Sequence, residues 1–433
     1  MSENKPKARR AVIVAGQRTP FAKAFSTLLK LDTIALSVKA VESLLKKTGI
    51  GHQVVDAIYW GSVILPSAAP NVAREIALDL RINPSSDAFT VSRACTSGLQ
   101  AITLAAAAIE RGEADIIIAG GSDSTSNAEV TLPPKVVHAL APIALGKPKA
   151  SDYLGVLAQL MPFHDIFPKM PKIAERTTGE KMGESAEKMA QRWEISREDQ
   201  DAFTVRSHQR AAAAIASGRF DEEVVPVETP DGSWLHTDAL VRAETSIEKL
   251  SRLRPVFAKN GTLTAANSTP LTDGAAAVLL MSEEKAREMG LKPLAAFRSW
   301  SYVGVDPRDQ LLIGPALAMP QALQRAGLSI ADIDVVDIHE AFAAQVLCVL
   351  KALESEHFCR LRLGLEQPIG PIEPEKLNVH GGSVAIGHPF GATGARMVTT
   401  MAHELAYTGK RTALLGICAA GGLAAAAVLE RVE

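Results

Sequence analysis

Apolar runs separated by turn residues divide the first part of the chain into short buried elements. The pattern predicts strands at residues 11–20, 54–63 and 114–119 and helices at residues 34–47 and 71–80. The third strand is expected to stop at Gly120 and Gly121. Because strands alternate with helices, the pattern indicates a parallel sheet built from βαβ units.

Residues 127–248 have a different composition, richer in charge and proline, with a helical or irregular pattern. Helices are expected at residues 182–193 and 197–217, and residues 136–170 mix prolines with apolar residues, as in an inserted layer or lid. The strand pattern resumes at residues 261–282. We therefore predict four segments: a first half at 1–126, an inserted loop domain at 127–248, completion of the first half at 249–290, and a second half at 291–433.

The last third of the chain repeats the pattern of the first. Residues 318–326, Gly327 and residues 333–338 match the helix at 34–47, Gly49 and the strand near residue 54. Residues 391–407, Gly409 and residues 412–417 match the segment from the helix after Cys95 to the strand at 114–119. The two matches, in the same order, predict a duplicated α/β unit. Its active site is expected between the halves, near the strand ends.

The composition narrows the possible classes of protein. The chain has 433 residues, 47% of them hydrophobic, and a formal net charge of −2, without the basic stripe typical of nucleic-acid binding. The basic residues within positions 1–10 are expected to form a disordered leader, and they lack the apolar stretch of a signal peptide. The four cysteines lack the spacing of a disulfide framework or zinc site, so we expect a cytoplasmic protein without a metal.

Cys95 lies where a strand-like run gives way to a helix that is apolar on all sides. Such a helix is a buried one, and the positive end of its dipole is expected to lower the pKa of the thiol. A lowered pKa would make Cys95 a nucleophile. The alternative is that Cys95 is a small buried apolar residue.

Three further loops place reactive side chains beside glycine or alanine at the end of an element. They carry His339 with Glu340, His388 in a glycine-rich turn that opens a helix, and Cys418 at the end of a buried strand. Small residues allow a substrate to approach backbone N–H groups. Alternatively, His339 packs in the core, Glu340 caps the following helix, and the glycines serve only the turn or a phosphate loop. We predict no catalytic role for Cys348 or Cys359.

Taken together, these segments resemble the thiolases, which transfer acyl groups between CoA thioesters. The resemblance runs nearly end to end, through RTPFAK, SRACTSGLQA, TAANSTPLTDGAAAVLLMS, HEAFAAQ, GGSVAIGHPFGATGAR and CAAGG. It implies a duplicated five-layer α/β/α/β/α core with an inserted loop domain. It also implies that Cys95 is acylated, that His388 activates it, and that Cys418 is the acid/base for the second substrate. His388 and a water held by His339 would stabilise the enolate oxygen. The backbone N–H groups of Cys95 and Ala420 would stabilise the oxyanion of the tetrahedral intermediate.

Two positions depart from the commonest thiolase pattern. Position 339 is usually asparagine, and position 420 is usually glycine. Both variants, and the segment at 163–190, are similar to the β-subunit of trifunctional β-oxidation complexes. The resemblance therefore favours degradative cleavage of medium or long 3-ketoacyl-CoA. The alternatives are a biosynthetic acetoacetyl-CoA acetyltransferase and, on the same fold, a non-catalytic acyl-CoA-binding protein.

The same resemblance implies binding residues and partners. Coenzyme A would be a substrate, with no resident cofactor, and its contacts would come from Met182, Gly183, Arg242, Thr269 and Phe342. The chain is expected to form a homodimer or tetramer. The apolar segment at 136–170 would contact a hydratase/dehydrogenase subunit or a membrane surface, or else pack on its own dimer.

Overall fold

The computed structural model describes residues 9–168 and 174–433, which form two compact units. The main unit comprises the chain up to Asn127 and from Ala174 to Glu433, and the smaller unit lies within Ala128–Ile173. Most of the expected basic leader, residues 1–8, lies outside the described residues. Arg10 lies within them and pairs with Glu430 at 2.5 Å, directly before the first strand.

The first half of the main unit is a sheet covered on one face by helices α1 (Thr33–Thr48) and α2 (Val72–Asp79). Across the sheet the strands follow the order β1 (Ala11–Arg18), β8 (Thr272–Ser282), β5 (Ile116–Ser124), β3 (Ala57–Gly61) and β4 (Asp87–Val91), with the short β2 (Ala22–Lys23) beside β8. Helix α1 ends at Gly49, whose φ of 68° is the left-handed conformation that glycine adopts without strain.

The second half repeats this order, which confirms the predicted duplication. Its strands run β9 (Ala295–Gly304), β12 (Leu423–Arg431), β11 (Thr412–Ala419) and β10 (Val335–Ile338). The parallel bridge between Val336 and Leu377 takes the place of β4 in the first half. An antiparallel pairing of β1 with β9 joins the two sheets.

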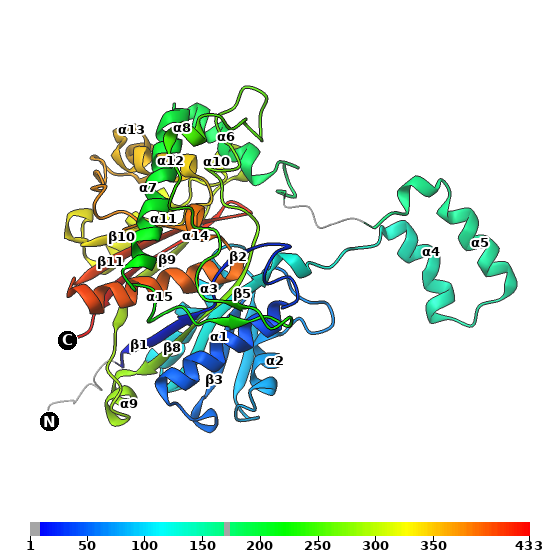
Figure 1. The fold of residues 1–433 in the computed structure, drawn as a ribbon, viewed down its shortest axis with the longest axis horizontal. Coiled ribbons are helices and arrows are strands. Elements are labelled where there is room, and N and C mark those ends of the chain that lie inside the picture. The colour runs from blue at the N-terminus through cyan, green and yellow to red at the C-terminus, as the bar shows by residue number, and fades with distance from the viewer. Residues whose placement is uncertain (1–8, 169–173) are drawn as a thin grey trace. The chain divides into compact units, whose positions relative to one another are not determined.

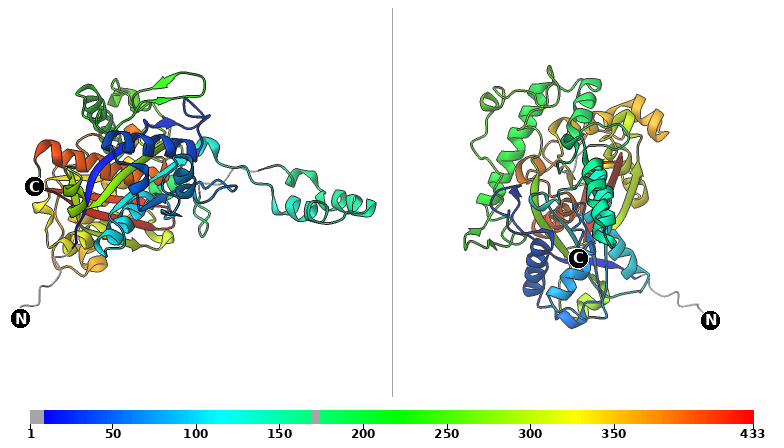
Figure 2. Two further views of the ribbon diagram at one scale, coloured as in Figure 1. Left: turned by 90° about the horizontal axis from the view of Figure 1, so that it is seen from below. Right: turned by 90° about the vertical axis from the view of Figure 1, so that its right-hand side faces the viewer.

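Two helices lie between the sheets. Helices α3 (Ser97–Glu110) and α15 (Phe390–Thr408) share one apolar core with strands of both halves. Helices α11 (Pro315–Ala326) and α12 (Ala343–Glu354) cover the outer face of the second sheet. In Figure 1, α15 crosses the middle of the main unit, with α1 and α2 on one side and α11 and α12 on the other. The fold is therefore the expected five-layer α/β/α/β/α arrangement, seen from two further directions in Figure 2.

The sheet is mixed, so the expectation of a parallel sheet was wrong. Strands β3, β4 and β5 are parallel, as are β10 and β11, but β8 and β12 run antiparallel to both of their neighbours. Strand β5 also continues through Gly120 and Gly121 to Ser124 instead of stopping at the glycines. A Cβ on Gly120 would lie 2.2 Å from the Ala276 carbonyl oxygen, so glycine here permits close packing and does not end the strand.

The remaining elements connect these layers. In the main unit they are α6 (Met182–Arg192), α7 (Arg197–Ala216), β6 (Val227–Glu228), β7 (Trp234–Leu235), α8 (Ile247–Leu250), α9 (Glu283–Glu288), α10 (Pro307–Gln310), α13 (Glu356–Phe358) and α14 (Ser383–Ile386). Most of the segment predicted at 127–248 therefore belongs to the main unit.

The smaller unit contains the antiparallel pair of helices α4 (Pro134–Leu145) and α5 (Ala150–Leu160). Much of its apolar surface is exposed, notably Leu145, Leu154 and Phe167. Among the described residues, no helix is both long enough and apolar enough to cross a membrane.

Candidate active site

Cys95 lies in the turn between β4 and α3. The preceding residue, Ala94, has a φ of 47°, which is uncommon for a residue with a side chain. The Ser97 hydroxyl closes the turn, donating to the Ala94 carbonyl and accepting from the Arg93 N–H. The nucleophile candidate is therefore held by a tight turn at the start of a buried helix.

Two glycines bring the start of α3 against the start of α15. A Cβ on Gly98 would lie 2.3 Å from the Gly391 carbonyl oxygen, which leaves no room for a side chain. Cys95 comes three residues before Gly98, and His388 comes three residues before Gly391. The contact between the two helices therefore places the candidate nucleophile and its candidate base at one junction.

His388 is buried and fixed at both its backbone and its ring. Its N–H donates to Thr272 Oγ1 at 3.0 Å, and its Nδ1 lies 2.6 Å from Thr393 Oγ1. Burial, and then the positive charge of Arg396, lower the pKa of His388 to about 3. His388 is therefore a neutral imidazole at physiological pH.

His339 follows β10, and its ring lies 4.1 Å from the ring of His388. Its Nδ1 is 2.9 Å from Ser383 Oγ, whereas its Nε2 is buried and has no hydrogen-bond partner among the described residues. Burial, followed by His388 and Arg396, holds the pKa of His339 well below its usual value. The structure thus brings two neutral imidazoles together.

Cys418 is the next-to-last residue of β11, and the turn that follows places Ala420 at Cys95. The backbone N–H groups of Ala420 and of Cys95 itself point to the Cys95 thiol. These two N–H groups are the donors that the sequence predicted for an oxyanion. Burial raises the pKa of Cys418 well above its usual value, and the charge of Cys95 raises it further.

The expected low pKa of Cys95 was wrong. Burial raises the pKa of the thiol to about 12, and the nearby Asp123 carboxylate adds to this, against the lowering effect of the two N–H groups. Loss of hydration outweighs the favourable field at the helix start. Cys95 is therefore a protonated thiol at neutral pH.

The residues predicted to bind coenzyme A lie around this cluster. A Cβ on Gly183 would lie 2.3 Å from the Phe257 ring, which stands edge-on to Phe342 at 5.8 Å. Met182 packs on the same apolar core as these rings. The Thr269 hydroxyl donates to the backbone carbonyl oxygen of Ser383 at 2.9 Å. The side-chain hydroxyl of the same Ser383 is the partner of His339.

Arg242 lies beside helix α7. Its backbone N–H donates to His208 Nδ1 at 3.2 Å. Burial, and then the positive charge of Arg242, lower the pKa of His208 to about 4.

Several residues of the site were not expected from the sequence. Glu340 does not cap the following helix; its carboxylate accepts from Ser207, Asn378 and the Val384 N–H, and so holds the loop before His388. Ser383 and Arg396 support His339, and Thr393 supports His388. Hydroxyl residues inside the motif GGSVAIGHPFGATGAR were the available signal.

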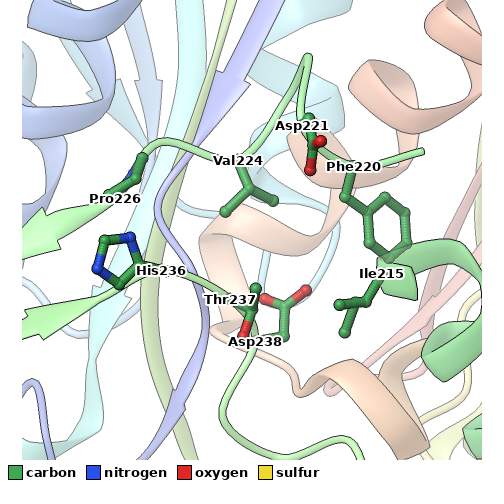
Figure 3. A pocket seen from close by; sticks show the side chains of 8 residues that line it. All are labelled: Ile215, Phe220, Asp221, Val224, Pro226, His236, Thr237 and Asp238. Carbon is green, nitrogen blue, oxygen red and sulfur yellow. The ribbon is translucent and has the colours of Figure 1, made fainter. Parts of the chain in front are cut away.

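A separate pocket of about 280 Å³, shown in Figure 3, contains none of the predicted site residues. Its lining residues are Ile215, Phe220, Asp221, Val224, Pro226, His236, Thr237 and Asp238. The Asp238 carboxylate already accepts from Arg18 Nη1 and Nη2, at 2.7 and 2.8 Å. The candidate cysteines and histidines therefore lie outside this pocket. Among the described residues, no group of histidine, cysteine and carboxylate side chains could hold a metal.

Two cysteines, two neutral imidazoles and paired backbone donors, set between duplicated α/β halves, are the groups that an acyl-transferring thiolase requires. The family model described as thiolase, N-terminal domain matches residues 11–284, and that described as thiolase, C-terminal domain matches residues 291–431. This chain belongs to the thiolase family.

Its curated relatives include proteins named 3-ketoacyl-CoA thiolase. It is 44% identical over 426 residues to a protein of Yersinia enterocolitica serotype O:8 / biotype 1B named 3-ketoacyl-CoA thiolase, and 45% identical over 426 residues to one of Yersinia pestis (strain Pestoides F) with the same name. Each match covers 97% of both chains.

Solved structures agree on the fold. The crystal structure of human mitochondrial 3-ketoacyl-CoA thiolase gives a TM-score of 0.83 at 30% identity, covering 98% of this chain and 100% of that one. The Bacillus anthracis acetyl-CoA acetyltransferase gives 0.83 at 32% identity, covering 99% and 100%.

Proposed function

We propose that this protein is a degradative thiolase of fatty-acid β-oxidation. It cleaves a 3-ketoacyl-CoA with coenzyme A into acetyl-CoA and an acyl-CoA shortened by two carbons. The observation that carries the proposal is the meeting of Cys95 and Cys418 with the neutral His388 and His339. The names of the full-length relatives support the degradative direction.

In the first half-reaction the Cys95 sulfur attacks the 3-keto carbon while His388 takes the thiol proton. Because the pKa of the thiol is about 12 and that of the imidazole about 3, this proton moves as the carbon–sulfur bond forms, not before. The N–H groups of Cys95 and Ala420 stabilise the oxyanion that develops. The Cα–Cβ bond then breaks and leaves the enolate of acetyl-CoA.

In the second half-reaction the enolate is protonated and the acyl group leaves the enzyme. Cys418 gives its proton to the enolate carbon, and His388 and His339 stabilise the enolate oxygen, directly or through a water. Acetyl-CoA leaves, and coenzyme A enters and passes its thiol proton to the Cys418 thiolate. Its sulfur attacks the acyl group on Cys95 and carries it away as a new thioester, and the Cys95 sulfur that is released takes back the proton held by His388. The reaction involves no net oxidation, so coenzyme A is a substrate and no redox cofactor is needed.

Alkylation and product analysis test this proposal. Iodoacetamide should label Cys95 before Cys348 and Cys359, which are buried away from the site, and acetyl-CoA should protect Cys95. Incubation with coenzyme A and 3-ketoacyl-CoAs of increasing length should yield acetyl-CoA, with greatest turnover on medium or long chains. Full thiolysis by a Cys95→Ala variant would overturn the mechanism, and tight acyl-CoA binding without cleavage would indicate a binding protein.

We also propose that the protein is a cytoplasmic homodimer or tetramer. All four cysteines are free thiols, which fits a reducing compartment. Strand β4 is the last strand of its sheet, and an edge strand offers unpaired N–H and C=O groups to a second copy. Light scattering on the purified protein should give a mass of two or four chains, and a monomer would contradict the assembly.

For the smaller unit we propose contact with a membrane surface. Its exposed apolar side chains Leu145, Leu154 and Leu157 are accompanied by the exposed Lys147 and Lys149, which suit anionic lipid headgroups. Co-sedimentation with anionic vesicles should fall when Leu154 and Leu157 are both changed to serine, whereas thiolysis should not change. Co-purification of a hydratase/dehydrogenase chain without vesicle binding would instead favour a protein partner.

A further inference from the structure

The two nitrogens of the His339 ring lie in different surroundings. Nδ1 is 2.9 Å from Ser383 Oγ, and Nε2 is buried without a partner among the described residues. A neutral imidazole carries its single proton on one nitrogen, so the partner of Nδ1 decides whether Nε2 donates or accepts. The site needs a donor at Nε2 if His339 is to serve an enolate oxygen or the water bound to it.

Arg396 fixes the direction of the Ser383 hydroxyl. Its Nη2 lies 3.5 Å from Ser383 Oγ, and a guanidinium can only donate, so this oxygen is an acceptor toward Arg396. Arg396 is held in turn by Asp337, whose carboxylate accepts from Nη1 at 2.8 Å, and both side chains are almost fully buried. The remaining hydrogen of Ser383 is thereby available to His339.

Among the described residues no other acceptor lies within reach of the Ser383 hydroxyl, so it donates to His339 Nδ1 and the proton of His339 lies on Nε2. Ser383 itself is fully buried, so within the described residues no solvent competes for its hydroxyl. The positive charge of Arg396 also lowers the pKa of His339, in the same direction as burial, so the ring stays neutral.

The neighbouring histidine has the opposite arrangement. Thr393 Oγ1 lies 3.4 Å from the Pro389 carbonyl oxygen, which only accepts, so the Thr393 hydroxyl donates there. At 2.6 Å it then accepts the Nδ1–H of His388 and leaves the His388 Nε2 lone pair free. The Thr393 hydroxyl thus leaves His388 Nε2 free to act as a base. The Ser383 hydroxyl leaves a proton on His339 Nε2, which can act as a donor.

We propose that Ser383 and Arg396 are positioning residues that hold His339 as the Nε2–H tautomer, opposite to the tautomer that Thr393 imposes on His388. The part of this inference that concerns the enolate rests on the proposed function, whereas the tautomers follow from the contacts alone. It also explains how histidine can serve at position 339, since only one of its tautomers places an N–H at Nε2.

The kinetic test is a double-mutant cycle between positions 383 and 339. In the wild-type background Ser383→Ala should lower kcat about tenfold or more with little change in KM, approaching the ~10²–10³-fold cost of losing an oxyanion donor. In a His339→Asn background the same change should have no effect, because an amide NH₂ donates whatever the serine does. Ser299→Ala, which removes a buried hydroxyl from the Ala322 carbonyl, is the matched control and should leave kcat unchanged.

The spectroscopic test does not depend on activity. In wild-type protein with ¹⁵N-labelled histidine, the resonances that disappear in His339→Asn should show the Nε2–H tautomer, and Ser383→Ala should mix the two tautomers. An Nδ1–H tautomer in the wild type, or an equal kcat loss from Ser383→Ala in both backgrounds, would overturn the inference. If the wild type cleaved no 3-ketoacyl-CoA, the proposed function would fail while the spectrum still decided the tautomer.

Discussion

Cys95 and His388 lie at touching helix starts, and burial keeps both uncharged at neutral pH. The pKa of the thiol is raised to about 12 and that of the imidazole is lowered to about 3. A thiol with so high a pKa is almost wholly protonated at neutral pH. In the proposed mechanism the nucleophile therefore forms as the sulfur attacks the substrate carbon, while the N–H groups stabilise the oxygen.

The pH dependence of alkylation measures this state of Cys95. Because the thiolate is the reacting form, its fraction should rise about tenfold for each pH unit below the pKa. The rate constant for iodoacetamide at Cys95 in the substrate-free protein should therefore increase steadily from pH 6 to pH 10. A rate that is already constant at pH 7 would show that the helix dipole outweighs burial.

At the scale of elements, the contact between α3 and α15 depends on the absence of a side chain at Gly98. In Gly98→Ala the new Cβ would meet the Gly391 backbone, which cannot move as a flexible side chain would. We expect a loss of about 1–3 kcal/mol in the free energy of unfolding and a lower kcat, since Cys95 and His388 would separate.

Chemical denaturation of Gly98→Ala checks this prediction. Gly51→Ala is the control, because Gly51 has an ordinary φ of −70° and open space around it, and it should leave stability nearly unchanged. Equal stability of the two variants would mean that the helices adjust without cost.

The turn between β11 and β12 is a second element that positions catalysis. Glu175 Oε2 accepts the N–H of Gly421, the residue after the proposed oxyanion donor Ala420, at 3.0 Å. Glu175 is itself largely buried, and its other oxygen accepts from Thr177. The carboxylate therefore ties the turn to the loop that follows the smaller unit.

Removal of the hydrogen bond between Glu175 and Gly421 should make the position of the Ala420 N–H less fixed. Glu175→Ala is expected to lower kcat about tenfold, below the cost of losing a donor outright, with a smaller effect on KM. Glu175→Gln keeps an oxygen acceptor and should retain most of the activity. Steady-state kinetics of the two variants decide the matter, and an unaffected kcat in Glu175→Ala would exclude a positioning role.

At the scale of the whole molecule, the two halves share the core in which α3 and α15 are buried. Neither half can bury these helices alone, because each helix packs on strands of both sheets. The halves of the main unit should therefore unfold together even though they are repeats.

Single-tryptophan variants can test this cooperativity. Trp60 lies in the first half and is fully buried, and Trp300 lies on β9 in the second. Retaining one or the other should give urea transitions with the same midpoint, as expected for a cooperative unit. Two separate midpoints would show that the halves are independent domains.

The sequence alone determined the layers of this protein and indicated its candidate chemical residues. Apolar periodicity located α1, α3, β3 and β11, because the spacing of apolar residues along the chain reflects which face of an element is buried. Comparison of the chain with itself found the duplication, and the motifs resembling thiolases pointed to Cys95, His388 and Cys418. These features depend on local pattern and residue type.

Only the tertiary structure decided the strand directions, the charge states and the tautomers. Strand direction depends on pairings between distant segments, such as β8 with β1. The apolar pattern of one strand does not indicate which strand it pairs with or in which direction. The pKa of Cys95 depends on how completely the fold removes water from it, which reversed the expectation drawn from its helix. Ser383 and Arg396 act through contacts across 44 and 59 residues of sequence, with His339 and Asp337, that exist only once the halves have packed.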